Sequence, residues 1–164
     1  QFSLVRKFFR LFRFLNVYLS MKKQWKKTVS QKRNFNFYIK ILTSLSLIIF
    51  YFTDNLLLLN KLNISSFSTN TIKLIQYYSD LSWVIEIALN ILTSSLGLIE
   101  LNNKKEKYQL SKLKQKKQFR SFIHNIFDFP IAMYYLGYHP HTQQLCYLLG
   151  TITSLMSLQS MYSK

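Results

Sequence analysis

Long apolar segments that alternate with basic ones are the feature that most limits how this chain can fold. The apolar segments lie at 35–59, 81–101, 122–136 and 145–162. A helix needs about 20 apolar residues to cross a bilayer, and the stretch from Ile41 to Leu59 is 19 residues long. We therefore predict an all-α integral membrane protein, a helical bundle of about four long helices in a single domain over residues 1–164.

The basic residues are gathered into two segments that flank the apolar ones. Lys and Arg total 22 against six acids, for a formal net charge of +16. Eleven of these basic residues precede the first acid, Asp54, and eight more lie between Lys104 and Arg120. Apolar spans with basic flanks follow the positive-inside pattern, whereas a nucleic-acid module would carry this charge on a folded polar face. The pattern predicts membrane lipids as partners and no nucleic acid.

The charge distribution also predicts a topology. Residues 1–33, a basic loop at 102–121 and Lys164 would share one side of the bilayer. The polar loop at 60–80 and the turn at 137–144 would lie on the other side. We expect the basic loop to be a solvated topology determinant, with binding of anionic lipid or an acidic partner as its alternative role.

The basic segment at 1–33 begins with helical periodicity. At 100° per residue, the cations between positions 6 and 13 fall within one arc, and the bulky apolar residues from Leu4 to Leu19 fall opposite. A basic amphipathic helix of this kind lies in a membrane interface, where each cation contributes about 1 kcal/mol. A bundle-packed helix and the remnant of a targeting presequence are the alternatives. The predicted lipid-surface residues are Arg6, Lys7, Arg10, Arg13, Lys22, Lys23, Lys26 and Lys27.

Acidic side chains occur within the first two apolar segments. We expect Asp54, near the end of the first, to reach the far headgroups or to cap a break in the helix, although an intramembrane acid is also a functional candidate. Glu86 begins a polar and small stripe in the second segment, which continues at helical spacing to Gly97. We expect a packing seam in which Glu86 pairs with another polar group such as His124. A proton or ion path through a small channel or carrier is the alternative.

The last forty residues predict two apolar helices joined by a short turn. Asp128 and Pro130 lie inside the first, and Gly137 and Pro140 end it. An acid at position 128 should face protein, water or a headgroup, and Pro130 removes a backbone donor. A water-soluble hairpin with a buried second helix is the alternative.

The second of these helices, from 145 to 162, has a face of small residues. Gly150, Ser154 and Ser157 are spaced four and then three residues apart, and small residues let helix backbones approach closely in lipid. We expect this face to pack against a helix of this chain, of a second copy or of another membrane subunit, with the lone Cys146 beside it. The predicted helix-packing residues are Gly150, Ser154, Ser157, Glu86, Asp128 and Pro130.

No sequence motif indicates catalysis or a cofactor. The chain has no Gly-rich phosphate loop, no nucleophile motif and no pair of acids at catalytic spacing. His139 and His141 resemble half a metal site, but no acid or cysteine lies near them in the sequence to complete it. Asn63-Ile64-Ser65 is a formal glycosylation triplet of a kind that is common by chance. We predict a non-enzymatic protein without metal or cofactor, apart from bound lipids such as anionic phospholipids.

Several short blocks carry a family resemblance. They are the basic stretch LVRKFFRLFRFL at 4–15, DNLLLLNKLNI at 54–64, SW at 82–83, FDFPIAMYYLG at 127–137 and LLGTITSLMSL at 148–158. The last two together form the most specific block. With these blocks the chain resembles the peroxin-11 family of peroxisomal membrane proteins.

The resemblance implies an all-helical peroxisomal membrane protein with both termini on the cytosolic side. It implies a role in peroxisome elongation, division and number through amphipathic-helix insertion and self-association, and it implies no catalytic residues. Family members usually have a further amphipathic region before the first block, and because the chain begins at Gln1 we expect a fragment or a processed form. The alternative function is a structural accessory subunit of a larger membrane complex, such as a respiratory or ATP synthase assembly of the mitochondrial inner membrane.

Overall fold

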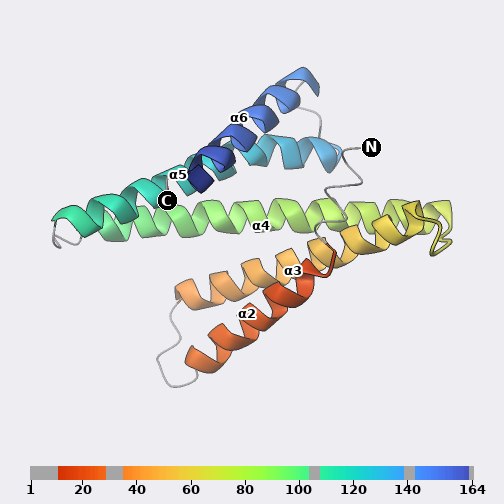
Figure 1. Ribbon diagram of the computed structural model, residues 1–164, viewed down its shortest axis with the longest axis horizontal. Coiled ribbons are helices and arrows are strands. Elements are labelled where there is room, and N and C mark those ends of the chain that lie inside the picture. Colours follow the sequence, from red (N-terminus) through yellow and green to blue (C-terminus); the bar gives the residue numbers. More distant parts are fainter. Residues whose placement is uncertain (1–10, 29–34, 104–107, 139–142, 163–164) are drawn as a thin grey trace. The chain divides into compact units, whose positions relative to one another are not determined.

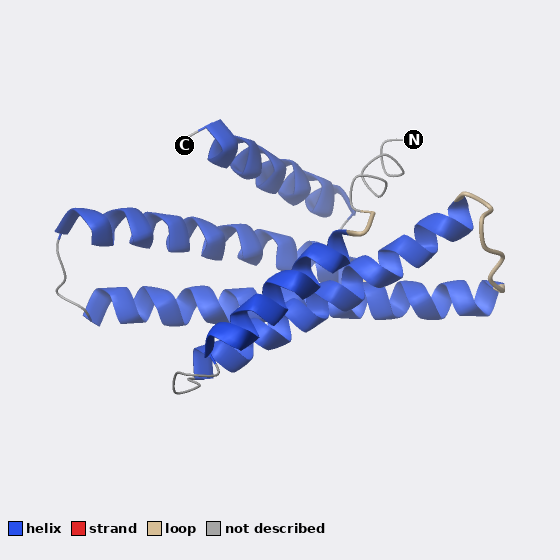
Figure 2. Cartoon of the chain, turned by 60° about the horizontal axis from the view of Figure 1, so that its bottom comes forward, coloured by secondary structure: helices blue, strands red, loops and turns tan. Residues whose placement is uncertain are grey.

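The structure is a computed structural model that describes residues 11–28, 35–103, 108–138 and 143–162. These residues form five helices and no strand, so the all-α prediction is confirmed (Figures 1 and 2). The helices are α2 (Arg13–Thr28), α3 (Phe35–Lys61), α4 (Thr69–Asn103), α5 (Tyr108–Tyr135) and α6 (Gln143–Tyr162).

The chain divides into two compact units, and the boundary between them falls inside α4. Unit 1 is Gln1–Glu86 and unit 2 is Ile87–Lys164. Unit 1 therefore contains α2, α3 and the first part of α4, and unit 2 contains the rest of α4 with α5 and α6.

In unit 1, α2 and α3 pack as antiparallel neighbours (Figure 1). Near the start of α2, the ring of Phe14 meets Phe52 edge to face, with centroids 5.7 Å apart. Near the end of α2, Trp25 lies 5.7 Å from Phe37 at the start of α3. Offset and edge-to-face ring pairs of this kind add about 0.5–1.5 kcal/mol each to the packing. Aromatic pairs therefore hold both ends of this hairpin.

The connection from α3 to α4 is a capped turn. Asn63 has a positive φ of 56°, in the left-handed region where asparagine is enriched. The N–H of Phe67 donates to the side-chain oxygen of Asn60 (3.0 Å). The N–H of Thr71 donates to the hydroxyl of Ser68 (3.2 Å), which caps the start of α4.

The predicted polar loop at 60–80 is wrong from Thr69 onward, because α4 begins there. The Ser, Thr and Asn residues that suggested a loop provide the turn and the cap. After the cap, Ile72 and Ile75 are half-buried, and Ser79 and Asp80 are buried. The first part of α4 can therefore be helical with few apolar residues, because small and hydrogen-bonded polar side chains occupy its buried face.

The predicted basic loop at 102–121 is also wrong from Tyr108 onward, where α5 begins. Lys, Gln, Leu and Arg are strong helix formers, and this stretch contains no Gly or Pro. The lysines from Lys112 to Lys117 are exposed along the helix, whereas Gln118 and Arg120 are half-buried. Positive charge was therefore a poor reason to expect a loop.

Gly137 ends α5, as predicted. Its φ of 99° is left-handed, a conformation that side chains disfavour. The N–H of Gly137 donates to the carbonyl of Tyr134, and the N–H of Tyr138 donates to that of Met133, each over 3.1 Å. This pair of bonds is the Schellman motif that ends many helices. Pro140 lies outside the described residues.

Candidate membrane surface and helix-packing sites

One face of α3 is a row of large, exposed apolar side chains. Their spacing alternates between three and four residues, which places them on a single face of a helix. This outer row of α3 consists of Phe35, Tyr38, Leu42, Leu45, Ile49 and Phe52. Phe35–Lys61 and Thr69–Leu101 are each long and apolar enough, by length and composition, to cross a membrane. A continuous exposed apolar surface marks a contact with a membrane or another protein.

The surface of α2 combines exposed apolar and basic side chains. Leu15, Tyr18, Leu19 and Trp25 are between 43% and 59% exposed. Of the predicted lipid-surface residues, Lys22, Lys23 and Lys26 are exposed on the same helix. At 100° per residue, Leu15 and Leu19 fall on the same side of α2 as Lys22 and Lys26, so apolar and basic side chains share the exposed side of this helix.

The other predicted lipid-surface residues have different positions. The guanidinium of Arg13 lies 5.2 Å from the ring centroid of Tyr51, a buried residue of α3, so this cation is turned onto the neighbouring helix. Lys27 lies in α2. Arg6, Lys7 and Arg10 lie outside the described residues, and their role as lipid-surface residues stays a prediction.

An apolar groove of about 400 Å³ lies between α2 and α3. Its walls include Met21 and Trp25 of α2 and Ile41 of α3, and Lys22 and Lys26 also line it. Long lysine side chains can cover apolar surface with their stems while their ammonium groups stay in water. The groove therefore combines an apolar lining with two lysine side chains.

Unit 1 also contains several buried polar residues, of which the sequence pattern had indicated only Asp54. Ser79, Asp80 and Ser82 of α4 are buried, as are Asp54 and Asn55 of α3. The side-chain amide of Gln76 donates to both carboxylate oxygens of Asp80 over 3.0 Å. Hydrogen bonds of this kind offset the cost of burying a charge.

The expectation for Asp54 is wrong in both of its forms. Asp54 is only 6% exposed, so it does not reach headgroups. It cannot cap a break either, because α3 runs unbroken from Phe35 to Lys61. The folded chain buries Asp54, and the sequence of one apolar segment does not show which other residues will surround it.

The polar stripe predicted from Glu86 to Gly97 lies on one side of α4 and is longer than expected. Ser94 is buried, and Glu86, Asn90 and Gly97 are half-buried. Ser79 and Ser82 extend the stripe toward the start of the helix at the same spacing of three and four residues. The spacing of three and four residues in the sequence could therefore have predicted that Ser79 and Ser82 belong to the stripe. Glu86 and His124 belong to different units, so the pairing between them stays a prediction.

In unit 2, Gly97 of α4 lies against the side chain of Gln118 of α5. A Cβ at position 97 would overlap the side-chain amide of Gln118. The amide therefore occupies the volume that a side chain would have filled, and the glycine is required for this contact. Gly97 thus contacts a neighbouring helix, as the packing seam expected from Glu86 to Gly97 requires.

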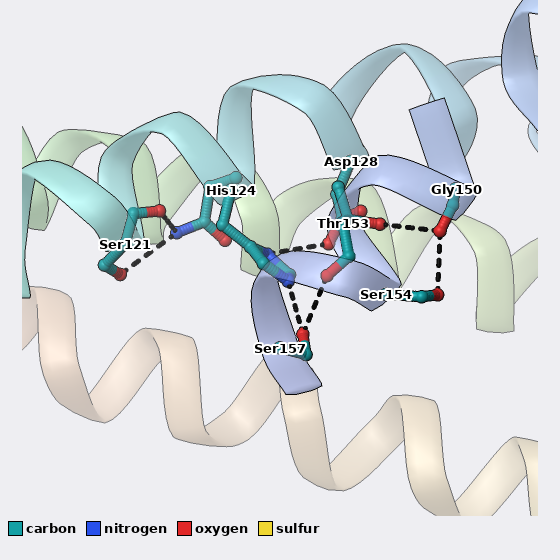
Figure 3. Close-up of polar contacts among 8 residues, drawn as sticks. Ser121, His124, Asp128, Gly150, Thr153, Ser154 and Ser157 are labelled. Atoms are coloured by element: carbon teal, nitrogen blue, oxygen red, sulfur yellow. Dashed lines mark hydrogen bonds and ion pairs between the residues drawn. The ribbon is translucent and has the colours of Figure 1, made fainter. Parts of the chain in front are cut away.

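The contact between α5 and α6 is a short chain of polar groups centred on His124 (Figure 3). His124 Nδ1 lies 3.1 Å from Asp128 Oδ2 on the same helix. His124 Nε2 lies 3.0 Å from the hydroxyl of Ser157 on α6. The Ser157 hydroxyl donates in turn to the carbonyl of Thr153 over 2.9 Å. Asp128 therefore faces protein, as predicted for an acid in this helix.

The direction of the bond between His124 Nε2 and the Ser157 hydroxyl depends on the tautomer of the ring. While the hydroxyl donates to the carbonyl of Thr153, it can accept from Nε2–H. When Nε2 carries no hydrogen, the hydroxyl can turn and donate to it instead. Either direction joins α5 to α6.

The order of Ser157, His124 and Asp128 matches that of a nucleophile, a base and an orienting acid. Catalysis by such a set also needs N–H donors placed around the nucleophile to stabilise an oxyanion. Ser157 lies inside α6, where backbone N–H groups are used in helical hydrogen bonds. We therefore interpret this group as a polar link between two helices.

Arg120 adds a second link one turn earlier on α5. Its guanidinium donates to the carbonyl of Met156 and to the side-chain oxygen of Gln159 (3.2 Å) on α6. Hydrogen bonds to charged groups contribute about 1.5–3 kcal/mol. Together with His124, this arginine joins the two helices over two successive turns.

The face of α6 that meets α5 differs by one residue from the predicted small-residue face. Cys146 and Thr153 are buried, Gly150 and Ser157 are half-buried, and these four alternate at four and three residues. Ser154 is exposed, and its hydroxyl donates to the carbonyl of Gly150 over 2.7 Å. Contact of Ser154 with a second copy or a partner stays a prediction.

Two other predicted features have simple outcomes. Pro130 lies inside α5 and is half-buried. His139 and His141 lie outside the described residues, so the structure does not test them. Within the described ranges, no three His, Cys, Asp or Glu side chains lie close enough together to hold a metal ion.

These features define a class: all-α proteins with helices suited to a membrane, and with apolar and basic side chains exposed side by side. The family comparison is more specific. The profile of Peroxisomal biogenesis factor 11 (PEX11) matches residues 1–162, and the chain therefore belongs to the PEX11 family, which acts in peroxisome biogenesis.

No match was found among curated proteins or among solved structures. The peroxin-11 resemblance is confirmed by the family match. The comparisons give no support to the alternative of a mitochondrial accessory subunit.

Proposed function

We propose that the chain is a non-enzymatic peroxisomal membrane protein that shapes the membrane during organelle proliferation. In this proposal α3 and α4 cross the bilayer, and α2 lies in the leaflet where α3 begins. The main support for membrane insertion is the outer row of α3. A water-soluble protein of this size has little reason to expose six large apolar side chains on one helix face.

The energetics favour lipid around this face. Full burial of a large apolar side chain contributes about 1.5–3 kcal/mol. The six residues of the outer row are between 42% and 67% exposed. Transfer of the row into hydrocarbon therefore contributes on the order of 5–10 kcal/mol. This gain is large enough to decide between water and lipid.

Membrane shaping would come from α2. Leu15 and Leu19 lie in the first half of α2 and can enter the acyl region, while Lys22, Lys23 and Lys26, in the second half, can extend their ammonium groups to the headgroups. A helix inserted in this way adds area to one leaflet only. The bilayer then bends toward the other leaflet, as elongation of an organelle requires.

Reconstitution into anionic vesicles tests the proposal. We expect the unmutated chain to float with the vesicles and to draw them into tubules seen by electron microscopy. The double substitution Leu15→Gln and Leu19→Gln should reduce tubules at least severalfold while the protein still floats, because α3 and α4 remain inserted. The matched control, Asn16→Gln with Ser20→Gln, changes two exposed polar residues of the same helix and should leave tubules unchanged. Equal tubulation by both double variants would contradict the role of α2.

A further inference from the structure

We infer that unit 2 holds a binding site for the headgroup of an aminophospholipid, in the cleft between the end of α4 and the start of α5. The cleft has a volume of about 460 Å³. The side chains that matter are Glu100 on α4, and Lys114, Lys117, Gln118 and Ser121 on α5.

The shape of the cleft follows from helical spacing. Gly97 and Glu100 are three residues apart on α4, and Lys114, Lys117 and Ser121 are spaced by three and four on α5, so each set lies on one face. Gly97 provides no side chain, and the amide of Gln118 lies against it. The glycine therefore leaves the space beside the cleft that the Gln118 amide occupies.

Gln118 supplies a hydrogen-bond acceptor at this place. Its Oε1 atom is buried and makes no hydrogen bond with the described residues. Leaving a buried acceptor unsatisfied costs about 1–3 kcal/mol, so a ligand with N–H donors would be stabilised here. A primary ammonium group has three such donors.

The charges around the cleft match two groups of opposite sign. Lys114 and Lys117 suit a phosphodiester, to which Ser121 can add its hydroxyl. Glu100 and Gln118 Oε1 suit an ammonium, since a carboxylate accepts several hydrogen bonds at once. Ethanolamine and serine headgroups contain both groups. A choline headgroup has no N–H donor, and a glycerol headgroup has no cation.

The position of the cleft indicates a lipid as the source of this headgroup. Glu100 and Leu101 end the stretch Thr69–Leu101 that is long enough to cross a bilayer. This step rests on the proposed insertion of α4, which would place the cleft at headgroup depth. Lysines at that depth can extend their ammonium groups to the interface.

Native mass spectrometry of the full chain in detergent tests the site, with dioleoyl lipids added one at a time. We expect phosphatidylethanolamine and phosphatidylserine to bind at least tenfold more tightly than phosphatidylcholine and phosphatidylglycerol. The double substitution Lys114→Ala and Lys117→Ala should lower this affinity about tenfold or more. Glu100→Gln should remove the preference over phosphatidylglycerol. The matched control Lys116→Ala removes an exposed lysine of α5 that does not line the cleft, and it should change nothing.

The outcomes separate the site from its alternatives. Equal affinity for all four lipids, or an equal loss with Lys116→Ala, would overturn the site in favour of general surface charge. Displacement of the lipid by soluble phosphoethanolamine at comparable concentration would overturn the assignment to a lipid. Flotation of the same variants with vesicles separates the two proposals. A chain that does not float overturns membrane insertion, whereas a floating chain without lipid preference overturns only the headgroup site.

Discussion

Single polar side chains decide how α5 and α6 recognise each other. Ser157 and Ser154 are three residues apart on α6, yet only Ser157 bonds to His124, and Ser154 is exposed. Both hydroxyls also donate to a carbonyl four residues earlier in the helix. The difference between the two serines is therefore one interhelical hydrogen bond.

This pair gives a direct measurement of that bond. We expect Ser157→Ala to lower the free energy of unfolding by about 1 kcal/mol, because His124 Nε2 loses its partner. Ser154→Ala should change it by less than about 0.5 kcal/mol, as expected for an exposed position. Unfolding in mixed micelles, followed by circular dichroism, measures both. An equal effect of the two substitutions would mean that the His124 bond adds nothing.

Gly150 allows a graded test of the same helix contact. A Cβ at this position would lie 3.8 Å from the Cδ1 atom of Ile131, an ordinary van der Waals distance. Gly150→Ala should therefore be tolerated, and should even gain slightly from the higher helix propensity of alanine. Gly150→Leu should destabilise by about 1–3 kcal/mol, because the larger side chain overpacks the contact. Leu148→Ile, at an exposed position, is the control. The same unfolding measurement compares the three variants. A harmless leucine would show that the two helices do not pack closely at Gly150.

At the scale of helices, the main correction concerns α5. Its first part was expected to be a loop because of its charge, but a lysine-rich segment with good helix formers is still a helix when one side finds a partner. The partner contact here is Gln118 against Gly97 of α4. As a result, the cations are held along a rigid element and not along a solvated loop.

Proline scanning tests this helix. Gln115→Pro should lower stability by about 3 kcal/mol or more, because proline removes a helical hydrogen bond and its ring clashes with the preceding turn. Gln115→Ala, the control, should be neutral or slightly stabilising, because alanine is the best helix former. Circular dichroism and unfolding in micelles would record both. If Gln115→Pro were tolerated as well as Gln115→Ala, this part of the chain would be a loop and not a helix.

The sequence predicted the elements that depend on local pattern and missed those that depend on partners. Long apolar segments predicted α3 and α6, and Gly137 predicted the end of α5, because these signals lie within each segment itself. Asp54 was misplaced, because the apolar residues around it in the sequence do not show that the fold buries its side chain. Gln118 carried no signal at all, because its role depends on a missing side chain across the cleft.

At the scale of the whole molecule, the proposed insertion of α3 and α4 makes the placement of charge testable. Two crossings return the chain to the side on which it began, so Lys26 and Lys114 should face the same compartment. The connection between α3 and α4, which contains Ser66, should face the other.

Cysteine labelling from each side of sealed vesicles measures this arrangement. With Cys146→Ser as the background, Lys26→Cys and Lys114→Cys should react with an impermeant reagent from the same side. Ser66→Cys should react only from the opposite side. Labelling of positions 26 and 114 from opposite sides would exclude a paired crossing by α3 and α4.

The length of α4 has a consequence for the membrane itself. At 1.5 Å per residue, the helical stretch Thr69–Leu101, 33 residues, extends about 50 Å. The hydrocarbon layer is only about 30 Å thick, so in the proposed insertion part of α4 must lie outside it. The residues before Leu81 suit that position, because they include Lys73, Gln76 and Asp80. The first turns of α4 would then project beyond the bilayer as a rigid helix, and they would hold the connection from α3 away from the membrane surface.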